Sequence, residues 1–374
     1  MILRDLLLQM LKRRASDLHL RVGIKPTLRI DGKLTAMELE PVSKEGMTEI
    51  LSQILSPEQQ QRFNARSEMD LALSVPELGR FRINLFRQRG TGGVAIRAVN
   101  TTVPDFEELC LPEKLRDLCE ERRGLIIVTG TTGSGKSTTL AAMIEHINTQ
   151  RAENILTIED PIEFMYTDKE SIISQREVGS DSQSFANALR HAFRQDPDVI
   201  LIGEIRDTET MAIAMQAADT GHLVLTTLHT LNAVETISRI ISFFPPHQHQ
   251  QTRLLLAGTL KAIVCQRLLP RCDTIGRVPA VEILTATGAI RDAIIDPMKT
   301  TTILELIQLG NIQYGMQSFD QSIMKIYKQG WIDYETAMVS ATNPDDFDLR
   351  IKGITSSSDA GWQGTMAPAI DESA

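Results

Sequence analysis

The chain has 374 residues, a length that predicts about two domains because a single hydrophobic core rarely grows so large. Hydrophobic residues make up 42% of it, which is typical of an ordered protein, and no apolar run is long enough to span a bilayer. The formal net charge of −9 argues against sequence-independent binding to nucleic acid, so we expect no DNA or RNA partner.

The first hundred residues combine a helical pattern with an extended one. Apolar residues repeat at helical spacing from Leu3 to Leu11, and the polar residues between them differ from a signal peptide, so we expect a cytoplasmic protein. Residues 18–22 alternate with period two, and Asp31-Gly32 is a strong hairpin signal between two short runs. We predict an α+β domain with an antiparallel sheet over residues 1–100.

Three arginines lie near the end of this domain. In residues 80–85, apolar side chains alternate with Arg80 and Arg82, which places both guanidinium groups on one face of a strand. A glycine turn follows, and a returning strand brings Arg97 beside them. The pattern fits a solvated strand face as well as an anion site. Residues 101–121 then read as a linker, because prolines and acidic residues suit an extended connection.

A glycine-rich loop follows the apolar run 125–128 and precedes a helical pattern. Its glycines allow backbone N–H groups to turn inward on phosphates at the positive end of a helix. Lys136 is predicted to meet the β- and γ-phosphates, and Ser137 to hold Mg²⁺. The chain is therefore predicted to bind a nucleoside triphosphate. The residues predicted to contact it are Gly130, Thr131, Thr132, Gly133, Ser134, Gly135, Lys136, Ser137 and Thr138.

Beyond this loop, apolar strands alternate with helices, which is typical of a mostly parallel sheet covered on both faces. Strand 155–158 is followed by three carboxylates, Glu159, Asp160 and Glu163. Open α/β sheets place their chemistry at such strand ends, so we expect these groups to converge near the phosphates. A solvated acidic loop is the alternative interpretation.

Two more strands end in polar residues. Strand 199–202 is followed by Gly203-Glu204, and Gly203 stands where a common Walker B strand carries an aspartate. We therefore expect Glu204 to act on Mg²⁺ or its waters without that neighbour. The next strand is bracketed by His222 and His229, whose spacing does not fit a zinc-binding helix. Either histidine alone is more often structural than catalytic.

Residues 155–163, 196–207 and 220–230 resemble the Asp box, the atypical Walker B motif and the His box of the type II and type IV pilus secretion ATPases. Within that superfamily the chain resembles the type IV pilus retraction ATPases from residue 16 almost to its end. It lacks the tetracysteine zinc module of the assembly ATPases, which favours retraction. The element 289–296 matches a segment typical of retraction motors only in part.

The resemblance implies an α/β fold, with a RecA-like P-loop ATPase domain and its C-terminal helices over residues 122–352. It also implies a smaller, PAS-like N-terminal domain, and the composition of residues 353–374 predicts a disordered tail. The implied function is ATP hydrolysis by a homo-hexamer that powers pilus retraction and twitching motility. The implied location is the inner face of the cytoplasmic membrane, with a platform protein and a second retraction ATPase as partners.

The resemblance also implies roles for the candidate residues. Glu163 would orient or deprotonate water, Glu204 would support Mg²⁺, and His229 would sense the γ-phosphate, although the choice of base between the two glutamates stays open. A neighbouring subunit would reach the phosphates with its basic residues. The candidates for these trans-acting arginines are Arg80, Arg82 and Arg97.

Three alternative functions remain at this stage. The first is an accessory protein that uses ATP to fix its shape and hydrolyses little, which the imperfect element 289–296 keeps open. The second is a pilus assembly or type II secretion ATPase. The third, a small-molecule kinase, is weak because neither a lid region nor an acceptor-binding aspartate is evident.

Overall fold

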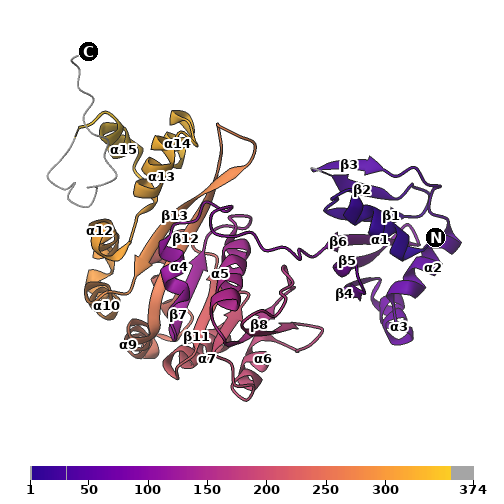
Figure 1. The fold of residues 1–374 in the computed structure, drawn as a ribbon. Coiled ribbons are helices and arrows are strands. Elements are labelled where there is room, and N and C mark those ends of the chain that lie inside the picture. The colour runs from indigo at the N-terminus through magenta and orange to yellow at the C-terminus, as the bar shows by residue number, and fades with distance from the viewer. Residues whose placement is uncertain (1, 31, 355–374) are drawn as a thin grey trace, which may run out of the picture. The chain divides into compact units, whose positions relative to one another are not determined.

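The computed structural model describes residues 2–30 and 32–354 (Figure 1). It forms two compact units, one of residues 1–102 with 163–165 and one of the remaining chain. The predicted disorder of 353–374 falls, from residue 355 onward, outside the described residues. Among the residues described, no helix combines the length and apolar character needed to cross a membrane.

The N-terminal unit is an antiparallel sheet with helices, as the alternating patterns predict. The strand order is β3-β2-β1-β6-β5-β4. Ile30 pairs with Lys33, which confirms the hairpin between β2 and β3. Its elements are α1 (Leu3–Lys12), β1 (Asp17–Arg21), β2 (Thr27–Ile30), β3 (Lys33–Ala36), α2 (Lys44–Ile54), α3 (Pro57–Arg66), β4 (Glu68–Val75), β5 (Gly79–Gln88) and β6 (Thr91–Ala98).

One face of this sheet carries the core of the unit. Leu18, Ile83 and Ile96 are fully or almost fully buried and belong to one cluster with Leu6 and Ile50 of the helices. Each such side chain contributes about 1.5–3 kcal/mol when it leaves water. Alternation then turns the intervening residues of the same strands to the opposite face, which includes the arginines.

The second unit is built on a sheet with strand order β13-β12-β7-β11-β10-β8-β9. All adjacent pairs are parallel except β12 with β13, so the prediction of a mostly parallel sheet is confirmed. Its strands are β7 (Gly124–Thr129), β8 (Asn154–Glu159), β9 (Ile172–Glu177), β10 (Val199–Ile202), β11 (Leu223–Leu228), β12 (Leu260–Pro270) and β13 (Arg277–Thr285).

Helices cover both faces of this sheet, because the strands are apolar on both sides. Leu125 and Ile127 pack in one cluster, while Ile126 and Val128 pack in the other. The helices are α4 (Lys114–Cys119), α5 (Lys136–Gln150), α6 (Phe185–Ala192), α7 (Thr208–Asp219), α8 (Ala233–Ser242), α9 (His249–Thr259), α10 (Gly288–Ile295), α11 (Ile303–Leu309), α12 (Asn311–Tyr314), α13 (Phe319–Lys328), α14 (Tyr334–Ser340) and α15 (Pro344–Ile351), with short 3₁₀ turns η1 (Pro246–Gln248) and η2 (Pro297–Thr302).

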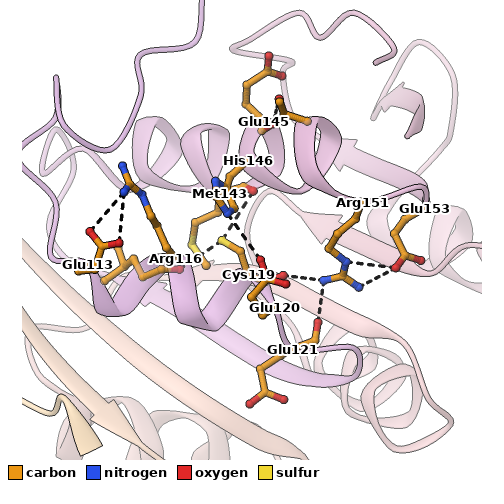
Figure 2. A network of polar contacts seen from close by, with 12 residues as sticks. Glu113, Arg116, Cys119, Glu120, Glu121, Met143, Glu145, His146, Arg151 and Glu153 are labelled. Carbon is orange, nitrogen blue, oxygen red and sulfur yellow. Dashed lines mark hydrogen bonds and ion pairs between the residues drawn. The ribbon is translucent and has the colours of Figure 1, made fainter. Parts of the chain in front are cut away.

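The predicted linker 101–121 contains α4, which packs into the core of the second unit. Figure 2 shows how Arg151, at the end of α5, ties this helix to the sheet. Its Nη1 donates to the carbonyl oxygens of Cys119 (2.6 Å) and Glu121 (2.9 Å), while its Nη2 donates to Glu153 (2.9 Å). The two carbonyl contacts hold the end of α4 beside the end of α5, so this part of the range is integral to the unit.

Candidate active site

The glycine-rich loop joins β7 to α5, as its pattern predicts. Gly130 has φ +144° and Gly135 φ +92°, conformations that side-chain-bearing residues rarely adopt. A Cβ at Gly130 would also lie 2.4 Å from the carbonyl oxygen of Gln266 on β12. At Gly133, by contrast, an added Cβ would meet no atom within 4 Å. The loop is thus packed closely against β12 at Gly130 and has open space at its tip, Gly133.

The loop and the first turn of α5 carry the polar groups that are predicted to bind phosphate. Lys136 is buried, and its Nζ donates to the carbonyl oxygens of Gly130 (2.9 Å) and Thr131 (3.0 Å). Ser134 is buried as well, and its hydroxyl has no hydrogen-bond partner among the described residues. Ser137 is exposed in the first turn of α5. This site fits a phosphate group, because it combines a glycine-rich loop, a lysine and the positive end of a helix.

The neighbouring strands deliver further polar residues to the same edge of the sheet. β11 lies between β7 and β10, and Ile202 of β10 pairs with Thr226 of β11. Both strands run parallel to β7, so their carboxyl ends lie on the same side as the phosphate loop. The residues that follow these ends are Glu204 and His229, as the sequence predicts.

Glu204 and His229 are brought together by this arrangement. The Nε2 atom of His229 lies 3.3 Å from Oε2 of Glu204, and Arg206 pairs with the other carboxylate oxygen. The side chain of Glu204 is 14% exposed and that of His229 is 51% exposed. A shielded carboxylate between two basic groups can accept hydrogen bonds from both. Sequence reasoning missed Arg206, whose only signal is its place two residues after Glu204.

Gly203 has a steric reason to replace the usual aspartate. Its N–H donates to the carbonyl oxygen of Ile158 (2.8 Å), which brings β10 close to β8. A Cβ at Gly203 would lie 3.3 Å from the Cα of Glu159, tighter than ordinary van der Waals contact. An aspartate side chain therefore fits poorly here, and Glu204 is the carboxylate that the strand presents.

The three carboxylates at and after the end of β8 do not form the expected cluster within the second unit. Glu159 is 8% exposed and accepts a hydrogen bond from the Thr157 hydroxyl (2.7 Å), so it acts as a buried structural carboxylate. Asp160 is exposed. Glu163 belongs to the N-terminal unit, where the neighbouring Met165 N–H donates to Asn100 (2.8 Å). Its catalytic role stays a prediction.

The arginine face of the N-terminal sheet is confirmed in its geometry. Arg82 of β5 pairs directly with Arg97 of β6, and Arg80 lies on the same face of β5. Arg97 is ion-paired, because its Nε donates to Asp17 of β1 (2.8 Å). Burial alone would raise the pKa of Asp17, but hydrogen bonds from Ser16 and Arg97 lower it below its ordinary value.

Asp17 was not singled out by its sequence pattern, since the residue reads only as a break after the first helix. Arg29 of β2 also lies 3.8 Å from its carboxylate. The exposed Arg82 and the paired Arg97 thus differ in their surroundings although they are cross-strand neighbours. Their action in trans stays a prediction.

A phosphate loop between a buried parallel strand and a helix, with a glutamate and a histidine after the two adjacent strands, defines a P-loop NTPase of RecA-like fold. The N-terminal unit adds the smaller α+β domain that the sequence predicts.

Known proteins share this organisation. A model of the type II/IV secretion system protein family matches residues 1–328. The type IV pilus ATPase PilU of Pseudomonas aeruginosa is 41% identical over 367 residues, which cover 98% of this chain and 95% of that protein. The type IV pilus retractation ATPase PilT of the same organism is 40% identical over 347 residues, covering 93% of this chain and 100% of that protein.

A solved structure agrees with these relatives. The crystal structure of the pilus retraction motor PilT with bound ADP has a TM-score of 0.84 to this chain at 41% identity, and the match covers 92% of this chain and 98% of that one. The chain therefore belongs to the type II/IV secretion system protein family. Membership of this family confirms the resemblance to the secretion ATPases that the sequence motifs indicate. It also agrees with the nucleotide-binding fold of the second unit.

Proposed function

We propose that the chain is a hexameric ATPase motor that powers type IV pilus retraction and hence twitching motility. The observation that carries this proposal is likeness over nearly the whole chain to PilT and PilU, together with a phosphate loop, Glu204 and His229 at one edge of the sheet. A likeness confined to the nucleotide fold would support ATP binding alone. Here it also includes the N-terminal domain.

Substrate binding follows from the loop. Its backbone N–H groups and Lys136 would hold the phosphates of ATP, and Lys136 would exchange its two loop carbonyls for phosphate oxygens. The hydroxyl of Ser137 and the carboxylate of Glu204 are hard oxygen donors, which suit Mg²⁺ directly or through its waters. When bound, the metal ion would neutralise charge on the phosphates.

Hydrolysis requires a water to attack the γ-phosphorus while the bond to the bridging oxygen breaks and ADP leaves with the electron pair. The proton of the water passes to a carboxylate, for which Glu163 and Glu204 are the two candidates. His229 contacts Glu204 and would report whether the γ-phosphate is present. If Glu163→Gln hydrolyses ATP at the wild-type rate, Glu163 is not the base.

The arginines of the N-terminal domain would act on the nucleotide of a neighbouring subunit. Arg82 is exposed, and neither Arg80 nor Arg97 lies far from it on the sheet face. A guanidinium placed against the γ-phosphate stabilises charge that grows during phosphoryl transfer. Loss of that phosphate would release the contact, so that the domains of the ring rotate and do mechanical work.

An accessory role with little hydrolysis is the second candidate. The observation in its favour is α10, where the element 289–296 carries Ile295 and Asp296 in place of the arginine and glutamate typical of principal motors. The rate of ATP turnover by the purified ring separates the motor from the accessory protein, because a motor hydrolyses ATP steadily and the accessory protein hydrolyses little. The proposed partners are an inner-membrane platform protein and a second retraction ATPase, at the inner face of the cytoplasmic membrane.

The test of the proposal is a count of surface pili on cells in which Lys136→Ala replaces the native chain. This variant blocks the nucleotide cycle and leaves the protein in place. Excess pili that do not retract are the expected result. Bald cells would show instead that the chain drives assembly, and a normal count with normal twitching would remove it from pilus dynamics.

A further inference from the structure

Strand β12 carries a buried polar side chain in a mostly apolar stretch. Gln266 is 3% exposed, between the buried Cys265 and the partly buried Arg267. Burying a carboxamide costs free energy unless its polar atoms are hydrogen-bonded. Such a residue in the middle of a strand therefore needs a compensating contact, which α5 and the phosphate loop supply.

The first contact is a hydrogen bond to the helix that follows the loop. The hydroxyl of Thr139 donates to Oε1 of Gln266 (2.8 Å), and both groups are buried. Thr139 stands in the first turn of α5, where its N–H donates to the carbonyl oxygen of Gly135 (2.9 Å). The carboxamide thus fixes the start of α5 relative to β12.

The second contact is steric and involves both glycines that flank the loop. The carbonyl oxygen of Gln266 backs Gly130, with 2.4 Å to the position of a Cβ there, and its Nε2 backs Gly135, with 2.9 Å to the equivalent position. One residue therefore supports the loop at its beginning and at its end. The open tip near Gly133 has no such support.

We infer that Gln266 is a positioning residue for nucleotide binding. It holds the phosphate loop in the shape that aims its N–H groups and Lys136 at the phosphates. Its side chain acts through Thr139 and Gly135, while its backbone carbonyl packs against Gly130. The inference rests on the proposed function only in that the loop binds a nucleotide. It assigns a role to a strand that lies outside all the recognised motifs.

The experiment is a double-mutant cycle with Gln266→Met and Thr139→Val on the full-length protein, read by the Kd of a fluorescent ADP analogue. Methionine keeps the volume of glutamine and removes the hydrogen bond. We expect each single variant to weaken binding about tenfold and the double variant to weaken it no further, because both remove the same contact. The KM for ATP should rise by the same factor.

Thr252→Val is the matched control, since Thr252 is a buried threonine of α9 whose hydroxyl donates to the backbone carbonyl oxygen of Gln248. It should bind the analogue like the wild type. The thermal midpoint of each variant without nucleotide shows whether it folds. If Gln266→Met does not fold, the affinity of Thr139→Val for the analogue tests the inference alone.

Wild-type affinity in either folded variant, or losses that add in the double variant, would overturn the inference. These outcomes are independent of pilus retraction, because they concern binding only. If the wild-type chain binds the analogue but Lys136→Ala cells keep a normal pilus count and normal twitching, the proposed function is contradicted and the role of Gln266 stays intact.

Discussion

The two units present their candidate groups in different ways. In the second unit, Glu204 and His229 follow buried parallel strands, and Glu204 is shielded between two basic groups. In the N-terminal unit, Arg82 and Arg97 stand on the open face of an antiparallel sheet, where only Arg97 is held by Asp17. The first arrangement is preorganised by its own core, while the second leaves Arg82 exposed on a sheet face, as the proposed action on a neighbouring subunit requires. A site shared between subunits needs both kinds of surface.

Lys136→Ala should have the largest effect and would show that the nucleotide unit is indispensable. Removing the ammonium group leaves the phosphates without their principal cation, so ATP turnover should fall by about 1,000-fold, to background. Phosphate release by the purified protein measures it. Turnover within tenfold of the wild type would mean that the loop does not perform the chemistry.

Arg82→Ala sharpens the comparison, because it tests whether the exposed face serves another subunit. Alone, it should lower turnover by about 1,000-fold, as the loss of an arginine finger does. Mixed with Lys136→Ala chains, it should regain activity, since some interfaces then contain both groups intact. No recovery in rings shown to be mixed would reject action in trans.

Glu204→Gln should reduce turnover by about 100-fold and leave ADP binding nearly unchanged, because the amide keeps the size of the side chain and removes its negative charge. Measurement of kcat beside the Kd of a fluorescent ADP analogue separates the two. Glu159→Gln is the control carboxylate, and we expect it to affect stability more than kcat since Glu159 bonds to Thr157.

Gly203→Ala should destabilise the second unit by about 1–3 kcal/mol, the usual cost of an overpacked methyl group. Its Cβ would press on the backbone of Glu159 at 3.3 Å. Chemical denaturation provides the measurement. Gly258→Ala is the matched control, because an added Cβ there meets no atom within 4 Å. Equal stability of both variants would contradict the steric account of the missing aspartate.

Asp17→Asn should have the smallest effect, below about 1 kcal/mol, because its partner Arg97 is largely exposed. The pKa of Asp17 is lowered in the folded protein from 3.8, so its stabilisation is present above that value and is lost as pH falls through the folded-state pKa. Denaturation at pH 7 and near pH 3 should differ less for Asp17→Asn than for the wild type. An unchanged difference would remove Asp17 from the acid response.

Much of the fold and site was predictable because local rules and global packing agree. The phosphate loop, the strand before it and the strands that end at Glu204 and His229 all carry the apolar runs of a buried parallel sheet. Period-two alternation likewise placed Arg82 beside Arg97. In each case residues close together in the sequence determine the strand and the face on which a side chain lies.

The remaining features depend on contacts between distant segments. Gln266 touches the loop only because β12 pairs with β7, and Asp17 meets Arg97 only because β1 pairs with β6. Gly203 approaches the backbone of Glu159 only because β10 pairs with β8. Sequence spacing carries no signal for such pairs.

The central claim is best tested by following fluorescently labelled pili on living cells that carry Glu204→Gln in place of the native chain. The account predicts pili that extend and then fail to shorten, while wild-type cells retract them. Retraction at the wild-type rate would show that hydrolysis by this chain does not drive the motion, and a failure to extend would show an assembly motor instead.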